Sequence, residues 1–241
     1  MSARIPLDFL TVISQDTSPC PYLDETALMP LSLGLNGVTI EQFDQVLAAG
    51  YRRTGHFFYD TRCPNCVACE PVRVDVGQFK PNRSQRRALK RGDQELELRV
   101  AEPVVDDQRV DLFNRHRKVR NLESGDGTTD AEDYRSFLVD SLCPVLEFSF
   151  WKATKLVMVA ITDVSEQSLS AVYCYFDPDY SYLSPGTYSI MKQIELCHRN
   201  MRRWFYLGMY VEQNKHLCYK ANFLPQQRLI GGLWVDFARD H

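Results

Sequence analysis

The feature that most constrains the fold is a series of strand-like segments in the second half of the chain. Each is a short run of apolar or alternating residues, the pattern typical of β-strands. They are residues 145–151, 155–164, 169–177, 203–211 and 228–237. The first three follow one another closely and predict an antiparallel meander. A helical segment at 185–200 predicts a crossover to the fourth strand.

The first half of the chain mixes helices with isolated strands. Thr39 and Gln42 form a capping box before an apolar helical pattern that ends at Gly50. Ser84 opens a second helix, which we expect to stop at Gly92. Further predicted elements are strands at 71–76 and 95–102 and helices at about 105–120 and 131–142.

This order of elements predicts an α+β fold in two parts. Residues 1–100 would form an N-terminal domain that carries a cysteine cluster and a basic helix. Residues 101–241 would form a C-terminal domain, with an acetyltransferase-like (GNAT-like) antiparallel sheet and flanking helices.

Composition narrows the class of protein. The chain has 241 residues, of which 44% are apolar, as in a globular protein. Its formal net charge is −3, so any affinity for a polyanion must come from local clusters of cations. Nothing approaches the roughly 18 consecutive apolar residues of a membrane span, and the N-terminus makes a poor signal peptide. We therefore expect a cytoplasmic protein with no membrane partner and with reduced cysteines.

Three cysteines at three-residue spacing, Cys63, Cys66 and Cys69, can direct three thiolates at one soft metal ion. A two-cluster ferredoxin sequence would need a fourth cysteine at position 73, where this chain has Arg73. Cys20, in a turn-rich loop of the same half, is the candidate fourth ligand. Zinc and an iron–sulfur cluster would both suit four thiolates. The alternative is a set of loop thiols without a metal.

A stripe of cations follows the cysteine loop. Its members recur at the spacing of one helical face, with no acidic residue among them. They are Arg83, Arg86, Arg87, Lys90 and Arg91. Like charges four residues apart repel by roughly 0.2–0.5 kcal/mol per pair, so the stripe indicates a phosphate-backbone partner. The alternative is a basic surface without a partner.

Four separated stretches cover most of the chain: "CPYLD", "GYRRTGHFFYDTRCPNCVACEPVRVDVGQFKPNRSQRRALKR", "YCYFDPDYSYLSPGTYSIMKQIELC" and "WFYLGMYVEQNKHLCYKANFLPQQRL". In this order they resemble the motifs of the bacterial aspartate/glutamate leucyltransferases, of the arginyl-tRNA–protein transferase family. The resemblance implies a cytosolic enzyme that transfers an amino acid from aminoacyl-tRNA to the N-terminal Asp or Glu of a protein. Leucine is the expected donor residue, and arginine stays open.

The resemblance implies further properties. The product would carry an N-degron that leads to degradation, and the C-terminal half would have the acetyltransferase-like fold. Eukaryotic members carry two cysteine pairs that bind a metal or cluster. Here the first pair is broken, because Pro21, Tyr22 and Leu23 follow Cys20, so Cys20, Cys63, Cys66 and Cys69 are the matching set. The transfer itself needs no cofactor, and DNA is not an expected partner.

The chemistry of the transfer selects candidate site residues. The attacking α-amine has a free pKa of about 7.7–8.0 and needs a proton acceptor, and the tetrahedral oxyanion needs donors. An acidic acceptor side chain suits the planar guanidinium of arginine. We therefore expect the acceptor carboxylate to bind among Arg52, Arg53, Arg73 and Arg83.

The shared motifs supply the remaining candidates. Glu212 would hold the incoming amine or the α-amine of the aminoacyl group, and Tyr219 and Lys220 would contact the terminal adenosine or an oxyanion. Tyr210 completes the catalytic set. The expected tRNA-binding residues are Arg86, Arg87, Lys90 and Arg91.

Two other functions fit part of the sequence. An acyl-coenzyme A transferase of the same fold would show a glycine-rich loop before the main helix, but here Gly186 stands alone after Pro185. A metal-containing RNA-binding module without catalysis would explain the cysteines and the basic helix. It would leave the Tyr-, Glu- and Lys-rich C-terminal motif unexplained.

Overall fold

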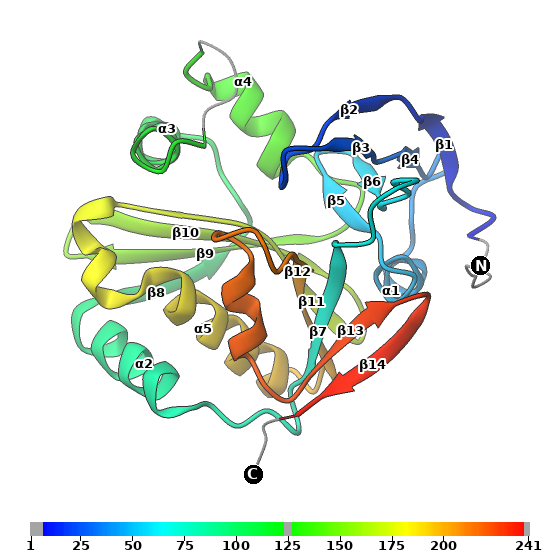
Figure 1. The fold of residues 1–241 in the computed structure, drawn as a ribbon. Coiled ribbons are helices and arrows are strands. Elements are labelled where there is room, and N and C mark those ends of the chain that lie inside the picture. The colour runs from blue at the N-terminus through cyan, green and yellow to red at the C-terminus, as the bar shows by residue number, and fades with distance from the viewer. Residues whose placement is uncertain (1–6, 123–126, 239–241) are drawn as a thin grey trace.

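An eight-stranded mixed sheet forms the centre of the molecule in the computed structural model, which describes residues 7–122 and 127–238 (Figure 1). Its strand order is β14-β13-β7-β12-β11-β10-β9-β8. The strands are β7 (Glu70–Asp75), β8 (Glu97–Ala101), β9 (Val145–Lys152), β10 (Lys155–Val164), β11 (Ser168–Phe176), β12 (Trp204–Tyr210), β13 (Gln226–Ile230) and β14 (Leu233–Phe237). Only the pair of β11 and β12 is parallel among these described strands.

The predicted meander and crossover are confirmed. Strands β9, β10 and β11 pair antiparallel in sequence order. A 3-10 turn, η2 (Pro178–Leu183), and helix α5 (Pro185–Arg199) then carry the chain to β12, parallel to β11. The predicted mixed α+β fold with a large sheet is thus confirmed.

The last predicted strand, 228–237, was wrong as a single strand. It is the hairpin of β13 and β14, because Gly231 and Gly232 turn the chain with φ of 58° and 84°. Paired glycines between two apolar runs favour such a two-residue turn.

The predicted division at residue 100 stays a prediction, and the large sheet does not follow it. Strand β7 comes from the segment before residue 100, β8 crosses that boundary, and the other six strands come from the segment after it. Strand β7 lies in the interior of the sheet, between β12 and β13.

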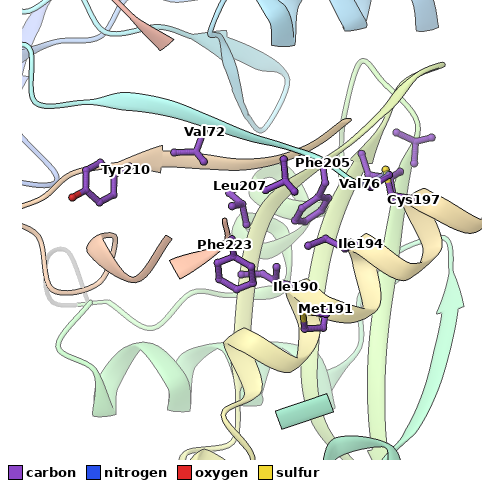
Figure 2. Packing of buried hydrophobic residues seen from close by; sticks show 13 residues of the cluster. Val72, Val76, Ile190, Met191, Ile194, Cys197, Phe205, Leu207, Tyr210 and Phe223 are labelled. Atoms are coloured by element: carbon purple, nitrogen blue, oxygen red, sulfur yellow. The ribbon is translucent and has the colours of Figure 1, made fainter. Parts of the chain in front are cut away.

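Helices cover both faces of the large sheet (Figure 1). Helix α5 and helix α2 (Arg83–Glu95) lie on one face and pack against each other. Figure 2 shows Ile190 and Ile194 of α5 against Phe205 and Leu207 of β12, in a cluster of buried side chains. Burial of side chains of this size stabilises the layer by about 1.5–3 kcal/mol each.

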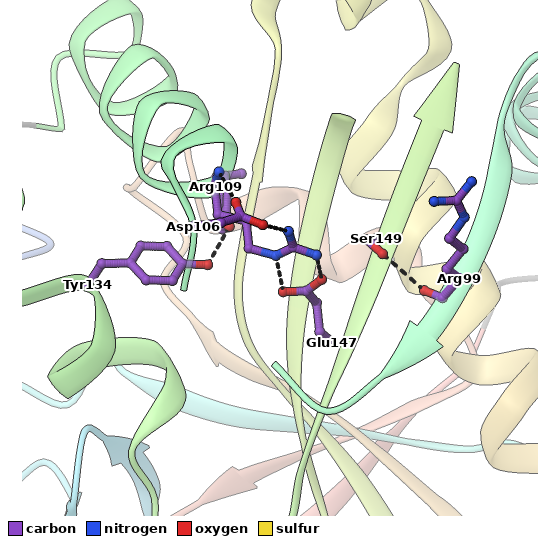
Figure 3. A network of polar contacts seen from close by, with 7 residues as sticks. Arg99, Asp106, Arg109, Tyr134, Glu147 and Ser149 are labelled. Atoms are coloured by element: carbon purple, nitrogen blue, oxygen red, sulfur yellow. Dashed lines mark hydrogen bonds and ion pairs between the residues drawn. The ribbon is translucent and has the colours of Figure 1, made fainter. Parts of the chain in front are cut away.

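Helix α3 (Asp107–Val119) lies on the opposite face, followed by α4 (Ala131–Tyr134) and the π turn η1 (Arg135–Val139). Arg109 of α3 binds Glu147 of β9 through two hydrogen bonds of 2.8 and 2.6 Å and also pairs with Asp106 (Figure 3). The Tyr134 hydroxyl bonds that of Tyr175 on β11. A buried bidentate pair holds its geometry rigidly, so this network fixes α3 and the following turn on the sheet.

Helix α2 does not stop at Gly92 as expected. It begins at Arg83, after the N-cap Asn82, and continues to Glu95. An added Cβ at position 92 would lie 2.4 Å from the Tyr188 ring on α5. Gly92 therefore allows the two helices to approach closely and does not end the first one.

The N-terminal segment forms two smaller sheets. One has the order β1-β4-β6-β5, and the other pairs β2 with β3. Their strands are β1 (Thr11–Ser14), β2 (Thr17–Pro19), β3 (Thr26–Leu28), β4 (Leu31–Leu33), β5 (Arg52–Thr54) and β6 (Phe57–Tyr59). Helix α1 (Ile40–Ala48) has the predicted capping box of Thr39 and Gln42. Its Phe43 and Leu47 share one apolar cluster with Tyr206 of β12, which joins the small sheet to the large one.

Within residues 7–122 and 127–238, every helix is too short or too polar to cross a membrane. One further 3-10 turn, η3 (Cys218–Asn222), lies between β12 and β13.

Candidate active site

A pocket of about 500 Å³ lies where β11 and β12 separate. The two parallel strands pair only from Ser168 to Ser170 on β11 and from Trp204 to Tyr206 on β12. Beyond these positions both strands line the pocket. Strand β5 and the loop after Cys20 form the opposite wall.

Each of the two separating strands carries a β-bulge at the pocket. Val172 is the extra residue of β11 against β10, and Leu207 is the extra residue of β12 against β7. Both line the pocket. Bulges bend a strand and redirect its side chains, so the local irregularity of these two strands keeps the space between them open.

Arg52 of β5 brings an unpaired cation into this pocket. Its side chain is buried, with 4% exposed, and burial lowers its pKa to about 10, so it stays protonated at neutral pH. Its Nη1 donates to the backbone oxygen of Tyr51, and its Cζ lies 5.0 Å from the centre of the Tyr206 ring. Nε and Nη2 have no partner among the described residues. Two unpaired nitrogens on one edge of a buried guanidinium suit a carboxylate.

Arg53, the next residue, is neutralised within the protein. Its Nε donates to Oδ1 of Asp163 on β10 over 2.7 Å, and both side chains are fully buried. Burial raises the pKa of Asp163, and the Arg53 guanidinium opposes that shift. The ion pair therefore leaves Arg52 as the pocket guanidinium without a carboxylate partner in the described part of the chain.

Lys220 of η3 places an amine on the floor of the same pocket. Burial lowers its pKa to about 7, and the nearby Arg52 guanidinium adds to this effect. Its Nζ donates to the backbone oxygen of Met209 over 2.8 Å. Gly208, with φ of 86°, faces Nζ, which an added Cβ would approach to 3.2 Å. An amine with this pKa can give and take a proton near neutral pH.

The rest of the pocket lining is largely apolar. Asp163 is the one acidic side chain among the described residues that line it, and Arg53 already pairs with it. The apolar lining residues are Met29, Leu31, Phe137, Ala171, Val172, Leu207, Met209 and Leu217. This wall suits an uncharged aliphatic side chain.

Of the eight predicted substrate-binding and catalytic residues, Arg52, Arg53 and Lys220 lie together in the pocket. The other five do not line it. Tyr210 is buried in the core under the Arg228 guanidinium, and Glu212 is exposed. Tyr219 is 37% exposed, outside the pocket.

The two remaining predicted arginines also lie elsewhere. Arg73 of β7 is stacked between two indole rings, with Cζ at 3.8 Å from the centre of Trp204 and 4.1 Å from that of Trp234. Its Nε donates to Gln227. Arg83 is exposed at the start of α2. Among the described residues, the guanidinium groups that line the pocket therefore come from β5 and not from β7 or α2.

The predicted basic stripe is exposed along α2, whose buried residues Gln85, Ala88 and Gly92 face the protein. Arg86 and Arg91 donate to the backbone oxygens of Pro81 and Tyr182. The other three cations have no partner among the described residues and are Arg83, Arg87 and Lys90. Their role in binding tRNA stays a prediction.

The four predicted metal-binding cysteines lie in two neighbouring loops. Burial raises the pKa of the Cys69 thiol to about 12, and the thiols of Cys20, Cys63 and Cys66 add to the shift, which places all four within electrostatic reach. Backbone N–H groups donate to Sγ of Cys20 and of Cys63, as they do to thiolate ligands. No three ligands in the described ranges meet at metal-binding distances. The donor chemistry suits zinc or an iron–sulfur cluster, and the metal stays a prediction.

Sequence reasoning missed several pocket residues. Asp163 interrupts the apolar strand "KLVMVAITDV", and a lone carboxylate in such a strand is a usable signal. Gly208 stands inside the strand "WFYLGMY", where an isolated glycine indicates a bulge or a close approach. Tyr22 and Tyr59, which also line the pocket, gave no signal beyond their place in the shared motifs.

The pocket between the separating strands holds an amine that can exchange a proton near neutral pH and a guanidinium without a carboxylate partner among the described residues, as a site for a group transfer would. Comparisons with known proteins give the family. Residues 18–87 match the N-terminal family model and residues 108–230 the C-terminal family model of the arginine-tRNA-protein transferases. The chain belongs to this family. The predicted family and the predicted transferase class are confirmed, and the two alternatives, an acyl-coenzyme A transferase and a non-catalytic RNA-binding module, are set aside.

Curated relatives support this assignment. The chain is 36% identical over 196 residues to the aspartate/glutamate leucyltransferase of Aeromonas hydrophila, covering 80% of this chain and 81% of that one. It is 33% identical over 216 residues to the protein of the same name from Methylobacillus flagellatus, covering 89% and 87%. Among solved structures, FemX matches with a TM-score of 0.52 at 7% identity, over 88% of this chain and 72% of that one. That likeness concerns the fold alone.

Proposed function

We propose that this chain transfers leucine from leucyl-tRNA to the N-terminal Asp or Glu of acceptor proteins in the cytoplasm, which gives them an N-degron. The proposal depends on one observation above all. The buried guanidinium of Arg52, with two nitrogens unpaired among the described residues, shares a pocket with the amine of Lys220, whose pKa is about 7. The first group fits the acidic side chain of the acceptor, and the second fits its reacting α-amine.

Recognition of the acceptor follows from charge and geometry. Arg53 is paired with Asp163, so Arg52 is the uncompensated guanidinium among the described residues that line the pocket, and its Nε and Nη2 are buried. An Asp or Glu side chain supplies one carboxylate and can accept from Nε and Nη2 of Arg52 together. An Asn or Gln side chain would leave the buried charge unpaired, which is strongly unfavourable.

The lining favours leucine over arginine as the donor residue. An arginyl side chain would need a free acidic partner in the pocket, and Asp163 is already bound by Arg53. A leucyl side chain would contact the apolar side chains of Val172, Leu207 and Leu217 without leaving a polar group unpaired.

The reaction needs two proton transfers, one from the attacking amine and one to the leaving ribose oxygen. The acceptor α-amine attacks the ester carbonyl of the aminoacyl group, so a C–N bond forms and the C–O bond to the terminal ribose breaks. Lys220, in its neutral form, takes the proton from the attacking nitrogen, and that proton then leaves with the ribose oxygen. The Nη2 of Arg53, which has no partner among the described residues, is the candidate donor for the oxyanion.

We further propose zinc or an iron–sulfur cluster on Cys20, Cys63, Cys66 and Cys69 as a structural element. When bound, it would hold the loop of Cys20, whose next residues Pro21 and Tyr22 line the pocket. The transfer chemistry does not pass through it.

Mass spectrometry tests the function directly. The protein is incubated with charged total tRNA and four peptides that differ only in their first residue, Asp, Glu, Asn or Gln. We expect a mass gain of one leucyl residue on the Asp and Glu peptides and none on the other two. No mass gain on any peptide, or equal gains on Glu and Gln peptides, would contradict the proposal.

A further inference from the structure

The rim of the pocket is built from two segments that are far apart in the sequence. Residues 214–219 follow β12, and Arg120 ends helix α3. Nη2 of Arg120 lies 2.7 Å from Nδ1 of His216, and Nδ2 of Asn214 donates to the backbone oxygen of Tyr22 over 2.8 Å. The segment therefore reaches from α3 to the loop of Cys20, and its Leu217 lines the pocket.

This rim carries cations without acidic partners. Lys118 and Lys215 are exposed and have no hydrogen bond or ion pair from their side chains among the described residues. Burial lowers the pKa of His216, and the Arg120 and Lys215 charges lower it further, so His216 is neutral at pH 7 and accepts from Arg120. Glu212, two residues before this segment, is exposed and makes no ion pair in the described part of the chain.

An aromatic side chain stands beside these cations. Tyr219 is 37% exposed, and its ring packs edge-on against Phe223, with 6.4 Å between the ring centres. Burial raises the pKa of its hydroxyl, and the Cys174 thiol adds to this effect while the Arg120 guanidinium opposes it. Tyr219 follows His216 by three residues, and Nδ1 of His216 lies 2.7 Å from Nη2 of Arg120. The next residue, Lys220, points into the pocket. Tyr219 thus lies at the rim, and the residue after it, Lys220, lies at the reaction site.

We propose that this rim binds the single-stranded 3′ end of the tRNA. A base stacks on Tyr219, the phosphates contact Arg120 and Lys215, and the terminal ribose with its ester enters the pocket at Lys220. Exposed aromatic rings beside cations bind unstacked nucleotides, whereas a duplex backbone needs cations alone. The stripe on α2 has no aromatic residue and fits the duplex part. The identity of the RNA rests on the function proposed above.

Binding of deacylated tRNA tests the rim without requiring any transfer. The dissociation constant is measured by fluorescence anisotropy for intact tRNA and for tRNA trimmed of its single-stranded 3′ nucleotides. For intact tRNA, Tyr219→Ala should raise the dissociation constant at least about fivefold, and Tyr219→Phe should leave it unchanged. Lys215→Ala should reduce the slope of log affinity against log salt by about 0.7. For trimmed tRNA all three variants should match the wild type.

Lys90→Ala on α2 is the matched control, an exposed lysine outside the rim, which should affect intact and trimmed tRNA equally. The inference is overturned if Tyr219→Ala and Lys215→Ala bind intact tRNA as tightly as the wild type. It is also overturned if they weaken binding of trimmed tRNA to the same extent. A failure of the peptide assay would leave these binding results intact, so the two proposals can fail separately.

Discussion

Replacing Lys220 by methionine tests the role of the buried amine. Burial lowers its pKa from 10.5 to about 7, so charging the amine in the folded state costs about 5 kcal/mol. Methionine fills a similar volume and carries no charge. We expect the variant to fold and to lose leucine transfer by roughly 10²–10⁴-fold, the usual range for a general base.

The pH dependence gives a second, independent measurement. Between pH 7 and 10.5 the unfolded chain binds one more proton at Lys220 than the folded chain does. The free energy of unfolding of the wild type should therefore rise with pH by about 1.4 kcal/mol per unit in this window, relative to Lys220→Met. Below pH 7 the amine is protonated in both states, and the difference between the two proteins should become constant.

Urea unfolding at several pH values between 6 and 9.5 measures this difference, and the rate of transfer at saturating peptide gives the kinetic counterpart. The wild-type rate should rise with pH up to about 7 and then level off. The residual activity of Lys220→Met should lack that inflection. A stability difference that does not change with pH would refute the assignment of a neutral Lys220, and a full transfer rate in the variant would refute its catalytic role.

Three further changes give separate expectations. Arg52→Gln should lower kcat/KM for Glu-starting peptides by roughly 30-fold or more, which corresponds to about 2 kcal/mol. The rate for Gln-starting peptides should rise or stay the same. An equal loss on both peptides would argue against a contact between Arg52 and the carboxylate. Gly92→Ala should reduce the free energy of unfolding, measured by urea titration, by about 1–3 kcal/mol, because the new methyl group would overlap the Tyr188 ring. Unchanged stability would show that α2 and α5 can move apart. Cys20→Ser should reduce the metal content found by elemental analysis of the purified protein. Cys143→Ser, which changes a buried thiol away from the cysteine loops, should leave the metal content unchanged. Equal metal content in both variants would remove Cys20 from the ligand set.

The sequence predicted those parts of the fold that depend on local patterns. The long apolar strands β9 to β11 and the helix before β12 were recognisable from periodicity, and the capping box of Thr39 marked the start of α1. The strands of the small N-terminal sheet have only three or four residues, which is too few for a period to be visible. Gly92 was misread because a glycine that ends a helix and one that admits a neighbouring ring have the same local sequence.

The site was predicted in part for a similar reason. Arg52, Arg53 and Lys220 were found through shared motifs, which carry residue identity but not position. The pairing of Arg53 with Asp163 joins residues 110 positions apart, and it alone decides which of the two arginines is free for a substrate. Glu212 and Tyr210 belong to the same motif as Lys220, yet one is exposed and the other is packed in the core.

The place of β7 between β12 and β13 has a consequence for synthesis of the protein. Arg73 bonds Tyr206 and Gln227, which follow it by 133 and 154 residues. At a ribosomal rate of about 5–20 residues per second, the two edges of β7 wait roughly 7–30 seconds for their partners. During this time an apolar strand with two open edges is exposed to other chains. We therefore expect slow, chaperone-sensitive folding, and a fragment truncated after the first hundred residues should aggregate rather than fold.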